Sequence, residues 1–119
     1  MTDLTIYEKR TCSKCRELSA LLVERGIAAE HVDFHVEAIS EATLRELLAK
    51  AGLRPREVLR SNEPLVAELG LLDGEGATDD ELIALMAEHP DLLQRPIAVR
   101  GERAVLARPA ERVLELLDP

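Results

Sequence analysis

The stretch LTIYEKRTCSKCRELSALL, residues 4–22, predicts a strand, a turn and a helix in immediate succession. Its first four residues have the apolar character of a short buried strand, and the polar run EKRT follows them as a turn. From Ser13 a helix is expected, because apolar side chains then recur at helical spacing, at Leu18, Leu21 and Leu22. Gly26 provides a signal for the end of this helix.

A second strand is predicted at residues 29–34, AEHVDF, where apolar and polar residues alternate. A strand, a helix and a strand within about 35 residues indicate a βαβ unit, whose two strands run parallel. The C-terminal third predicts a hairpin, because PIAVR (96–100) and RAVLA (103–107) flank Gly101-Glu102. Glycine in the first position of such a turn is typical of a type II′ turn.

The middle of the chain predicts several helices. Ser40 can cap a helix that ends near Gly52, and Thr78 with Glu81 forms a capping-box pattern that opens a helix ending before Pro90. Shorter helical segments are expected at RPREVLR (54–60) and EPLVAELG (63–70), each with a proline near its start.

A final helix is predicted at RPAERVLELL (108–117), with Pro109 in its first turn. The expected order is therefore β-α-β, several helices, and β-β-α. We predict an α/β fold with a mixed four-stranded sheet, in one domain that spans residues 1–119 and carries a helical insert at about residues 40–89.

The chain has 119 residues, with 15 basic and 23 acidic side chains and a net charge of −8. This balance argues against a nucleic-acid-binding surface, which needs a basic stripe, but it permits a small anionic substrate bound by clustered arginines. No stretch approaches the ~20 apolar residues of a membrane span, and the first ten residues lack a signal-peptide pattern. We expect a monomeric cytoplasmic protein without nucleic-acid or membrane partners.

Cys12 and Cys15 are the two cysteines of the chain, and they could form a metal site, a structural pair or a reactive thiol centre. Zinc normally has four ligands, but this single Cys-x-x-Cys pair is accompanied only by histidines without zinc-motif spacing, namely His31, His35 and His89. A cytoplasmic setting argues against a permanent disulfide. We therefore predict no metal and favour a reactive pair.

The position of Cys12 favours a thiolate, which is the nucleophilic form of cysteine. It lies at the predicted strand-to-helix turn, where free backbone N–H groups and the helix dipole stabilise an anion. Four cations lie near it in sequence, namely Lys9, Arg10, Lys14 and Arg16. Cys15 follows about one helical turn later, within reach for a disulfide, and a Cys-x-x-Cys beside a βαβ unit predicts thioredoxin-like redox chemistry.

Three arginines away from the cysteines also stand out, namely Arg60, Arg95 and Arg108. They belong to longer segments that keep a characteristic order, TIYEKRTCSKCR (5–16), LRSNEPLVAELGL (59–71), TDDELIALMAEHPDLLQRPIAV (78–99) and ARPAERVLELL (107–117). Over nearly the whole chain, these segments resemble the glutaredoxin-dependent arsenate reductases of the ArsC family. The resemblance implies a thioredoxin-like fold whose helical insert lies between the second and third strands.

The resemblance also implies a site and a reaction. Cys12 is the expected nucleophile, and Pro96 is the candidate for a cis peptide bond. The expected ligands of an arsenate oxyanion are Arg60, Arg95 and Arg108. Guanidinium groups bind such oxygens bidentately and offset the repulsion between a thiolate and an anion. In the family no cofactor is bound; glutathione attacks the adduct, and glutaredoxin resolves the mixed disulfide as arsenite is released.

Two positions depart from the family pattern. Glu8 stands where well-known reductases have histidine, and because a nearby carboxylate raises a thiol pKa, the four cations must outweigh it at Cys12. Cys15 stands where members with a single reactive cysteine have another residue. It offers an internal resolving thiol, whose disulfide a thioredoxin or glutaredoxin could reduce.

Two further functions compete with the enzyme. The related Spx regulators share this fold and the Cys-x-x-Cys, bind RNA polymerase and use the disulfide as a switch. Arg60 and the Arg108-Pro109 pair favour the enzyme, because these arginines suit an oxyanion better than a protein surface. A general thiol–disulfide redox protein without arsenate activity is the third interpretation, since a fold does not fix a substrate.

Overall fold

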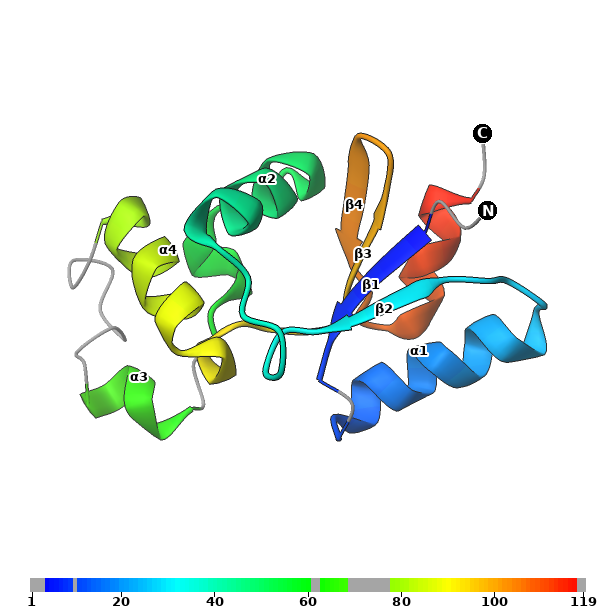
Figure 1. Ribbon diagram of the computed structural model, residues 1–119, viewed down its shortest axis with the longest axis horizontal. Coiled ribbons are helices and arrows are strands. Elements are labelled where there is room, and N and C mark those ends of the chain that lie inside the picture. The colour runs from blue at the N-terminus through cyan, green and yellow to red at the C-terminus, as the bar shows by residue number, and fades with distance from the viewer. Residues whose placement is uncertain (1–3, 10, 61–62, 69–77, 118–119) are drawn as a thin grey trace.

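Figure 1 shows the computed structural model of the protein, which describes residues 4–9, 11–60, 63–68 and 78–117. Strands, α-helices and short 3₁₀ helices, the last labelled η, follow one another along the chain. They are β1 (Leu4–Glu8), α1 (Ser13–Glu24), β2 (Glu30–Asp33), α2 (Glu41–Ala51), η1 (Pro55–Val58), α3 (Pro64–Glu68), α4 (Asp79–Glu88), η2 (Pro90–Leu92), β3 (Ile97–Arg100), β4 (Arg103–Leu106) and η3 (Ala110–Leu116).

The strands form one four-stranded sheet in the order β2-β1-β3-β4. β1 and β2 are parallel, which confirms the predicted βαβ unit. β3 runs antiparallel to β1, with Tyr7 opposite Ile97, and β3 and β4 form the predicted hairpin. Gly101 has a φ of +60°, whereas Glu102 is not among the described residues with a positive φ, so the turn has the sign pattern that type II′ requires.

This register gathers four chain segments at one end of the sheet. β1 and β2 both end there because they are parallel. β3 begins there because it is antiparallel to β1, and β4 ends there because it is antiparallel to β3. The segments that follow β1, precede β3 and follow β4 hold Cys12, Arg95 and Arg108 respectively.

Each face of the sheet supports its own hydrophobic core, as the alternation of side chains along a strand requires. On one face Leu4, Ile6 and Ala98 pack with apolar residues of α1 and η3. On the other face Tyr7 and Ile97 pack with residues of α2, η1, α4 and η2. Figure 1 shows α1 and η3 on one side of the strands and α2 on the other. The result is an α/β fold of the thioredoxin-like type.

Helix caps fall where the sequence signals predict them. The Oγ of Ser40 accepts a 3.1 Å hydrogen bond from the N–H of Thr43 at the start of α2. Gly52, with a φ of +66°, ends that helix in the left-handed conformation that glycine tolerates best. At α4, Thr78 and Glu81 bond each other's backbone N–H groups in a reciprocal capping box.

Two predicted helices take a different form. Residues 55–58 and 110–116 are 3₁₀ helices, because their backbone hydrogen bonds span three residues, as from the N–H of Arg112 to the carbonyl of Pro109 at 3.0 Å. Pro109 therefore precedes the last helix and does not lie in its first turn. The segment expected at 63–70 is helical over α3, and Gly70 lies outside the described residues. Among the helices described, none has the length and apolar character to cross a membrane.

Candidate active site

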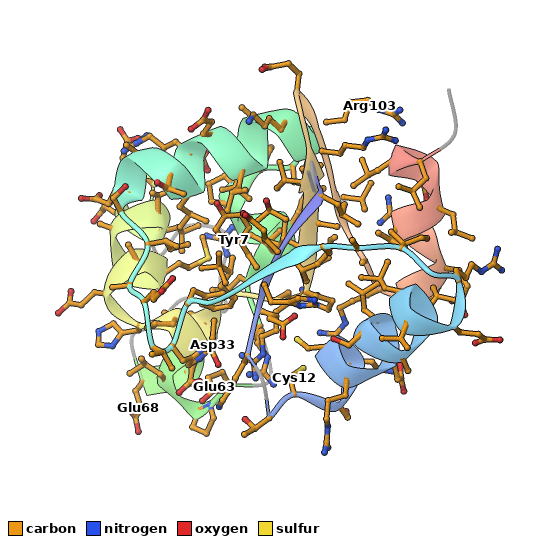
Figure 2. All side chains as sticks on the ribbon, turned by 45° about the vertical axis from the view of Figure 1, so that its right-hand side comes forward. Tyr7, Cys12, Asp33, Glu63, Glu68 and Arg103 are labelled. Atoms are coloured by element: carbon orange, nitrogen blue, oxygen red, sulfur yellow. The ribbon has the colours of Figure 1, made fainter. Side chains whose placement is uncertain are left out.

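Cys12 lies directly before α1, at the end of the sheet where the four segments meet. Its backbone is extended, with φ −77° and ψ 128°, as an N-cap residue requires. Its N–H donates to the carbonyl of Lys9 at 2.9 Å, and its carbonyl accepts from the N–H of Arg16 at 3.0 Å. The side chain is partly exposed, and Figure 2 shows it at the start of α1. A small substrate can therefore reach the sulfur.

Hydrogen bonds to its sulfur favour the thiolate form of Cys12. Burial by itself raises the pKa of the Cys12 thiol, but the donors around the sulfur outweigh this effect and leave the pKa below its ordinary value. Two of these donors are the backbone N–H groups of Lys14 and Cys15, which are free because they belong to the first turn of α1. The others are the Cys15 thiol and the Arg95 guanidinium.

The side-chain charges of Lys9, Lys14 and Arg16 are not among the causes that lower the pKa of Cys12. Lys14 and Arg16 are exposed on α1, and Lys9 lies 3.6 Å from a carboxylate on η2. Arg10 lies outside the described residues. The charged side chain that bonds the Cys12 sulfur is Arg95, which comes from the other end of the sequence.

Cys15 is the buried member of the pair, with 1 % of its surface exposed. Burial is the main cause that raises the pKa of the Cys15 thiol to about 12, although the Lys9 backbone N–H opposes it. The hydrogen bond to Cys12 and the negative charges of Cys12 and Glu8 raise the pKa as well. Both cysteines are free thiols in this structure. Cys15 therefore stays protonated at neutral pH and donates to the Cys12 thiolate.

Arg95 is a buried cation, with 6 % of its surface exposed. Its guanidinium donates a hydrogen bond to the Cys12 sulfur, and its Nη1 atom is buried without a hydrogen-bond partner among the described residues. Buried polar groups are nearly always hydrogen-bonded, so an unpartnered guanidinium nitrogen near a thiolate makes Arg95 a candidate ligand for an anion. The Arg95–Pro96 peptide bond is cis, and Pro96 is buried.

Arg60 follows η1 and is bound to the η2 segment that leads to Arg95. Its backbone N–H donates to the carbonyl of Leu92 at 2.7 Å. Its Nη1 atom lies 3.4 Å from the carbonyl oxygen of Asp91 and 3.4 Å from the Oε2 of Glu63. The η2 segment therefore ties the backbone and the side chain of Arg60 to the approach to Arg95.

Arg108 is exposed on the turn after β4. The Ala107 N–H donates to the Pro96 carbonyl at 2.9 Å, so the main chain next to Arg108 lies beside the start of β3. Within the described residues, no hydrogen bond or ion pair joins the Arg108 side chain to Cys12 or to the other two arginines. The structure thus links Arg95 directly to Cys12. Arg60 contacts the η2 segment, and the residue before Arg108 bonds the residue after Arg95.

Asp91, which the sequence analysis did not assign, connects several charged groups of this region. Its Oδ1 atom accepts a 2.9 Å hydrogen bond from Nε2 of His35 and lies 3.6 Å from Nζ of Lys9. The His35 hydrogen bond, together with the charges of Lys9 and Arg95, lowers the pKa of Asp91. Because His35 and Asp91 are 56 residues apart, no local pattern could have revealed the pair.

Glu8 has a different effect from the one expected. It is buried, with 5 % of its surface exposed, and its Oε1 atom lies 2.6 Å from Nδ1 of His31 on β2. The sequence analysis expected its charge to raise the pKa of Cys12, but the thiol whose pKa it raises is Cys15. The reason is geometric: Glu8 ends β1 with its side chain buried, as Cys15 is, whereas Cys12 is partly exposed.

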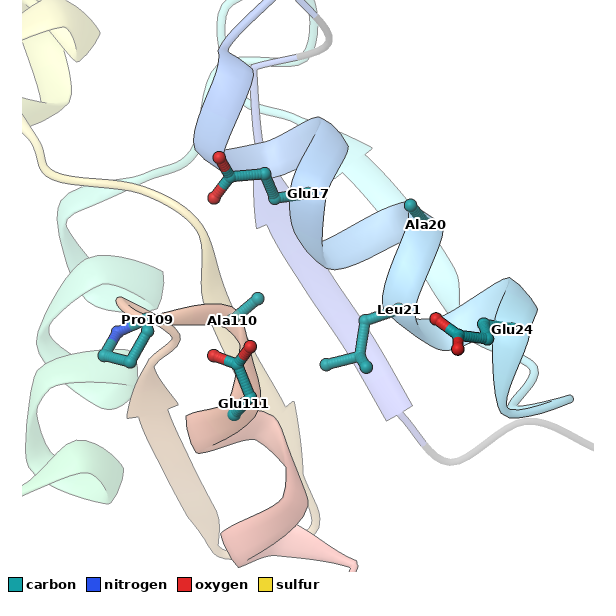
Figure 3. Close-up of a pocket in the computed structure, with 7 residues that line it drawn as sticks. All are labelled: Glu17, Ala20, Leu21, Glu24, Pro109, Ala110 and Glu111. Carbon is teal, nitrogen blue, oxygen red and sulfur yellow. The ribbon is translucent and has the colours of Figure 1, made fainter.

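A groove of about 420 Å³ lies between α1 and the Pro109 turn, as Figure 3 shows. It does not include the cysteines, and three carboxylates line it, those of Glu17, Glu24 and Glu111. These charges repel an anion, so the groove does not suit an oxyanion. Within the described residues, no cluster of three or more histidine, cysteine, aspartate or glutamate side chains could hold a metal ion.

A thiolate at the N-terminus of α1, a buried second thiol and a mixed four-stranded sheet define a cysteine-based redox protein of thioredoxin-like fold. The model of the ArsC family matches residues 7–116, and the chain belongs to the ArsC family.

Known proteins resemble the chain over nearly its full length. The structure described as an arsenate reductase from Vibrio cholerae is 42 % identical, with a TM-score of 0.88 over 94 % of this chain and 95 % of that one. The arsenate reductase of Neisseria meningitidis serogroup B is 36 % identical over 98 % of this chain and all of its own length. The uncharacterised protein YfgD of Escherichia coli K12 is 40 % identical over 97 % of each chain.

Proposed function

We propose that this protein is an arsenate reductase in which the Cys12 thiolate attacks arsenate held by Arg60, Arg95 and Arg108. The observation that carries the proposal is the Arg95 guanidinium, which bonds the Cys12 sulfur and keeps a buried Nη1 atom without a partner. An oxygen of a bound oxyanion can accept from that nitrogen while its central atom faces the sulfur. The names of the relatives support arsenate as the oxyanion.

In the first step the thiolate sulfur forms a bond to arsenic, and one arsenate oxygen leaves as water after protonation. Arsenic is still pentavalent in this adduct. Arg95 suits the step because it is charged at any physiological pH and buried, so its attraction for the incoming anion is weakly screened. Arg60 and Arg108 supply further positive charge from the neighbouring segments.

In the second step a thiolate attacks the Cys12 sulfur, and the electron pair of the sulfur–arsenic bond leaves with arsenic as trivalent arsenite. Two thiols are thereby oxidised to one disulfide. Glutathione with glutaredoxin can supply the second thiol, as can Cys15, and a glutaredoxin or thioredoxin then reduces the product. Formation of the adduct removes the Cys12 charge and hydrogen bond that contribute to the high pKa of Cys15, so Cys15 is easier to deprotonate at that stage.

A general thiol–disulfide redox protein is the second candidate. The hydrogen bond between the two thiols favours it, because the same geometry serves a disulfide whether or not an oxyanion binds. We further propose that the protein acts in the cytoplasm as a single domain, residues 1–119, with its helical insert at about 40–89, and that it needs no bound cofactor.

Arsenate-dependent oxidation of NADPH, coupled through glutaredoxin and glutathione or through thioredoxin, tests the proposal. The wild type is expected to turn over, Cys12→Ser to be inactive, and Cys15→Ser to keep some activity with glutathione and glutaredoxin. Absence of wild-type turnover with every reductant would rule out the reductase. Reduction of small disulfides by that same inactive preparation would support the second candidate, and recovery of RNA polymerase in a pull-down would favour a regulator.

A further inference from the structure

The Glu63 carboxylate contacts one of the arginines of the proposed oxyanion site. Its Oε2 atom lies 3.4 Å from Nη1 of Arg60, and both side chains are only about one quarter exposed, at 25 % and 24 %. Charges in such a half-buried position are screened less than those of a surface pair. Glu63 therefore occupies a guanidinium edge in the way that an oxyanion oxygen does.

Arg60 does not depend on Glu63 for its position. Its backbone N–H donates to the carbonyl of Leu92, and the same Nη1 atom donates to the carbonyl of Asp91. A second backbone bond, from the N–H of Gln94 to the carbonyl of Val58 at 2.8 Å, holds the two segments together. Loss of the Glu63 charge would thus free the guanidinium without releasing it from the site.

Arg95 differs from Arg60 in its burial and in its hydrogen bonds. It is more deeply buried than Arg60, and its Nη1 atom has no partner. One guanidinium of the pair is thus open to a ligand, whereas the other already has an anionic neighbour. An oxyanion that reaches both arginines therefore competes with the Glu63 carboxylate for the charge of Arg60.

We propose that Glu63 is the resident counter-ion of Arg60 and lowers the affinity of the site for oxyanions, because its negative charge competes with the substrate for the same guanidinium. The proposal rests on the oxyanion site described under the proposed function and adds to it the residue that weakens binding. Glu63 contacts an arginine and not the sulfur, so it acts on the substrate through Arg60 and is not a catalytic residue. Its removal is expected to improve oxyanion binding.

Glu68 on α3 provides a matched control for this test. It removes the same charge when it is changed to glutamine, but it is exposed, and Figure 2 draws it on the far side of Glu63 from Cys12. A difference between Glu63→Gln and Glu68→Gln at one ionic strength therefore reports the contact with Arg60 and not the net charge of the protein.

The experiment measures protection of Cys12 from alkylation by iodoacetamide, as a function of arsenate or sulfate concentration. Glu63→Gln is expected to lower the half-protecting concentration about threefold, the effect of a typical ion pair of this kind, and Glu68→Gln to leave it unchanged. Where arsenate is turned over, the KM for arsenate should fall by the same factor. Glu63→Ala should repeat the result, and circular dichroism checks that each variant is folded.

Unchanged or weaker protection in folded Glu63→Gln and Glu63→Ala would overturn the proposal, as would an equal gain in Glu68→Gln. The proposed function can fail separately. If the wild type neither binds nor reduces arsenate but the Glu63 variants bind arsenate or sulfate, the counter-ion role stands and the reductase does not. If no variant binds either anion, both proposals fall.

Discussion

Replacement of Cys15 by alanine is expected to raise the pKa of the Cys12 thiol. The wild-type thiolate accepts from four donors, namely two backbone N–H groups, the Arg95 guanidinium and the Cys15 thiol, and the substitution removes only the last. A hydrogen bond to a charged group contributes roughly 1.5–3 kcal/mol, and a thiol is a weak donor, which places it at the lower limit. Since one pKa unit corresponds to about 1.4 kcal/mol, the expected rise is about one unit.

The pH dependence of Cys12 alkylation by iodoacetamide measures this shift, with mass spectrometry to identify the modified residue. Cys15→Ser is the control, because its hydroxyl can still donate to the thiolate. We expect a smaller rise in Cys15→Ser than in Cys15→Ala. An unchanged midpoint in Cys15→Ala would refute the hydrogen-bond account, and equal shifts in the two variants would assign the effect to repacking around residue 15.

Two further predictions concern the acidic residues of the site. In a Cys12→Ser background, Glu8→Gln should move the titration of the Cys15 thiol, followed by NMR of its Cβ carbon, to lower pH, because the Glu8 charge raises the pKa of Cys15. Glu30→Gln, exposed on β2, is the control, and no movement would contradict the assignment. Asp91 has a lowered pKa in the folded protein, so its charge stabilises the fold above the unfolded pKa of about 3.9, and this stabilisation is lost as the pH falls through the folded value. In urea unfolding, the difference in the free energy of unfolding between the wild type and Asp91→Asn should therefore be smaller at about pH 3 than at neutral pH. An equal difference at the two pH values would contradict this prediction.

The fold could be predicted from sequence because its signals are local. The capping box at Thr78, the cap at Ser40 and the stop at Gly52 each lie within a few residues of the boundary they mark. The Gly101 turn likewise fixed the hairpin. The 3₁₀ form of the last helix was not predictable in this way, because Pro109 suits the start of either kind of helix.

The site was less predictable, because its electrostatics depend on contacts between distant segments. Proximity in sequence pointed to the lysines near Cys12, whereas the bonding cation is Arg95, 83 positions away. The hydrogen bond of His35 with Asp91 and that of His31 with Glu8 join separate strands and turns. No spacing rule relates such residues; family resemblance named the arginines but not these acidic partners.

The unequal burial of the two cysteines also determines which sulfur of a Cys12–Cys15 disulfide a reductant attacks. Only the Cys12 sulfur is accessible to an external thiol, so a reductant must form its mixed disulfide there and expel Cys15. Burial is the main cause of the raised pKa of Cys15 and persists in the mixed disulfide, so Cys15 is a poor leaving group and exchange through it is slow. Once formed, the Cys12–Cys15 disulfide should therefore persist until it meets a reductant that binds the surface around Cys12. The lifetime of the disulfide then measures how well a redox partner recognises that surface.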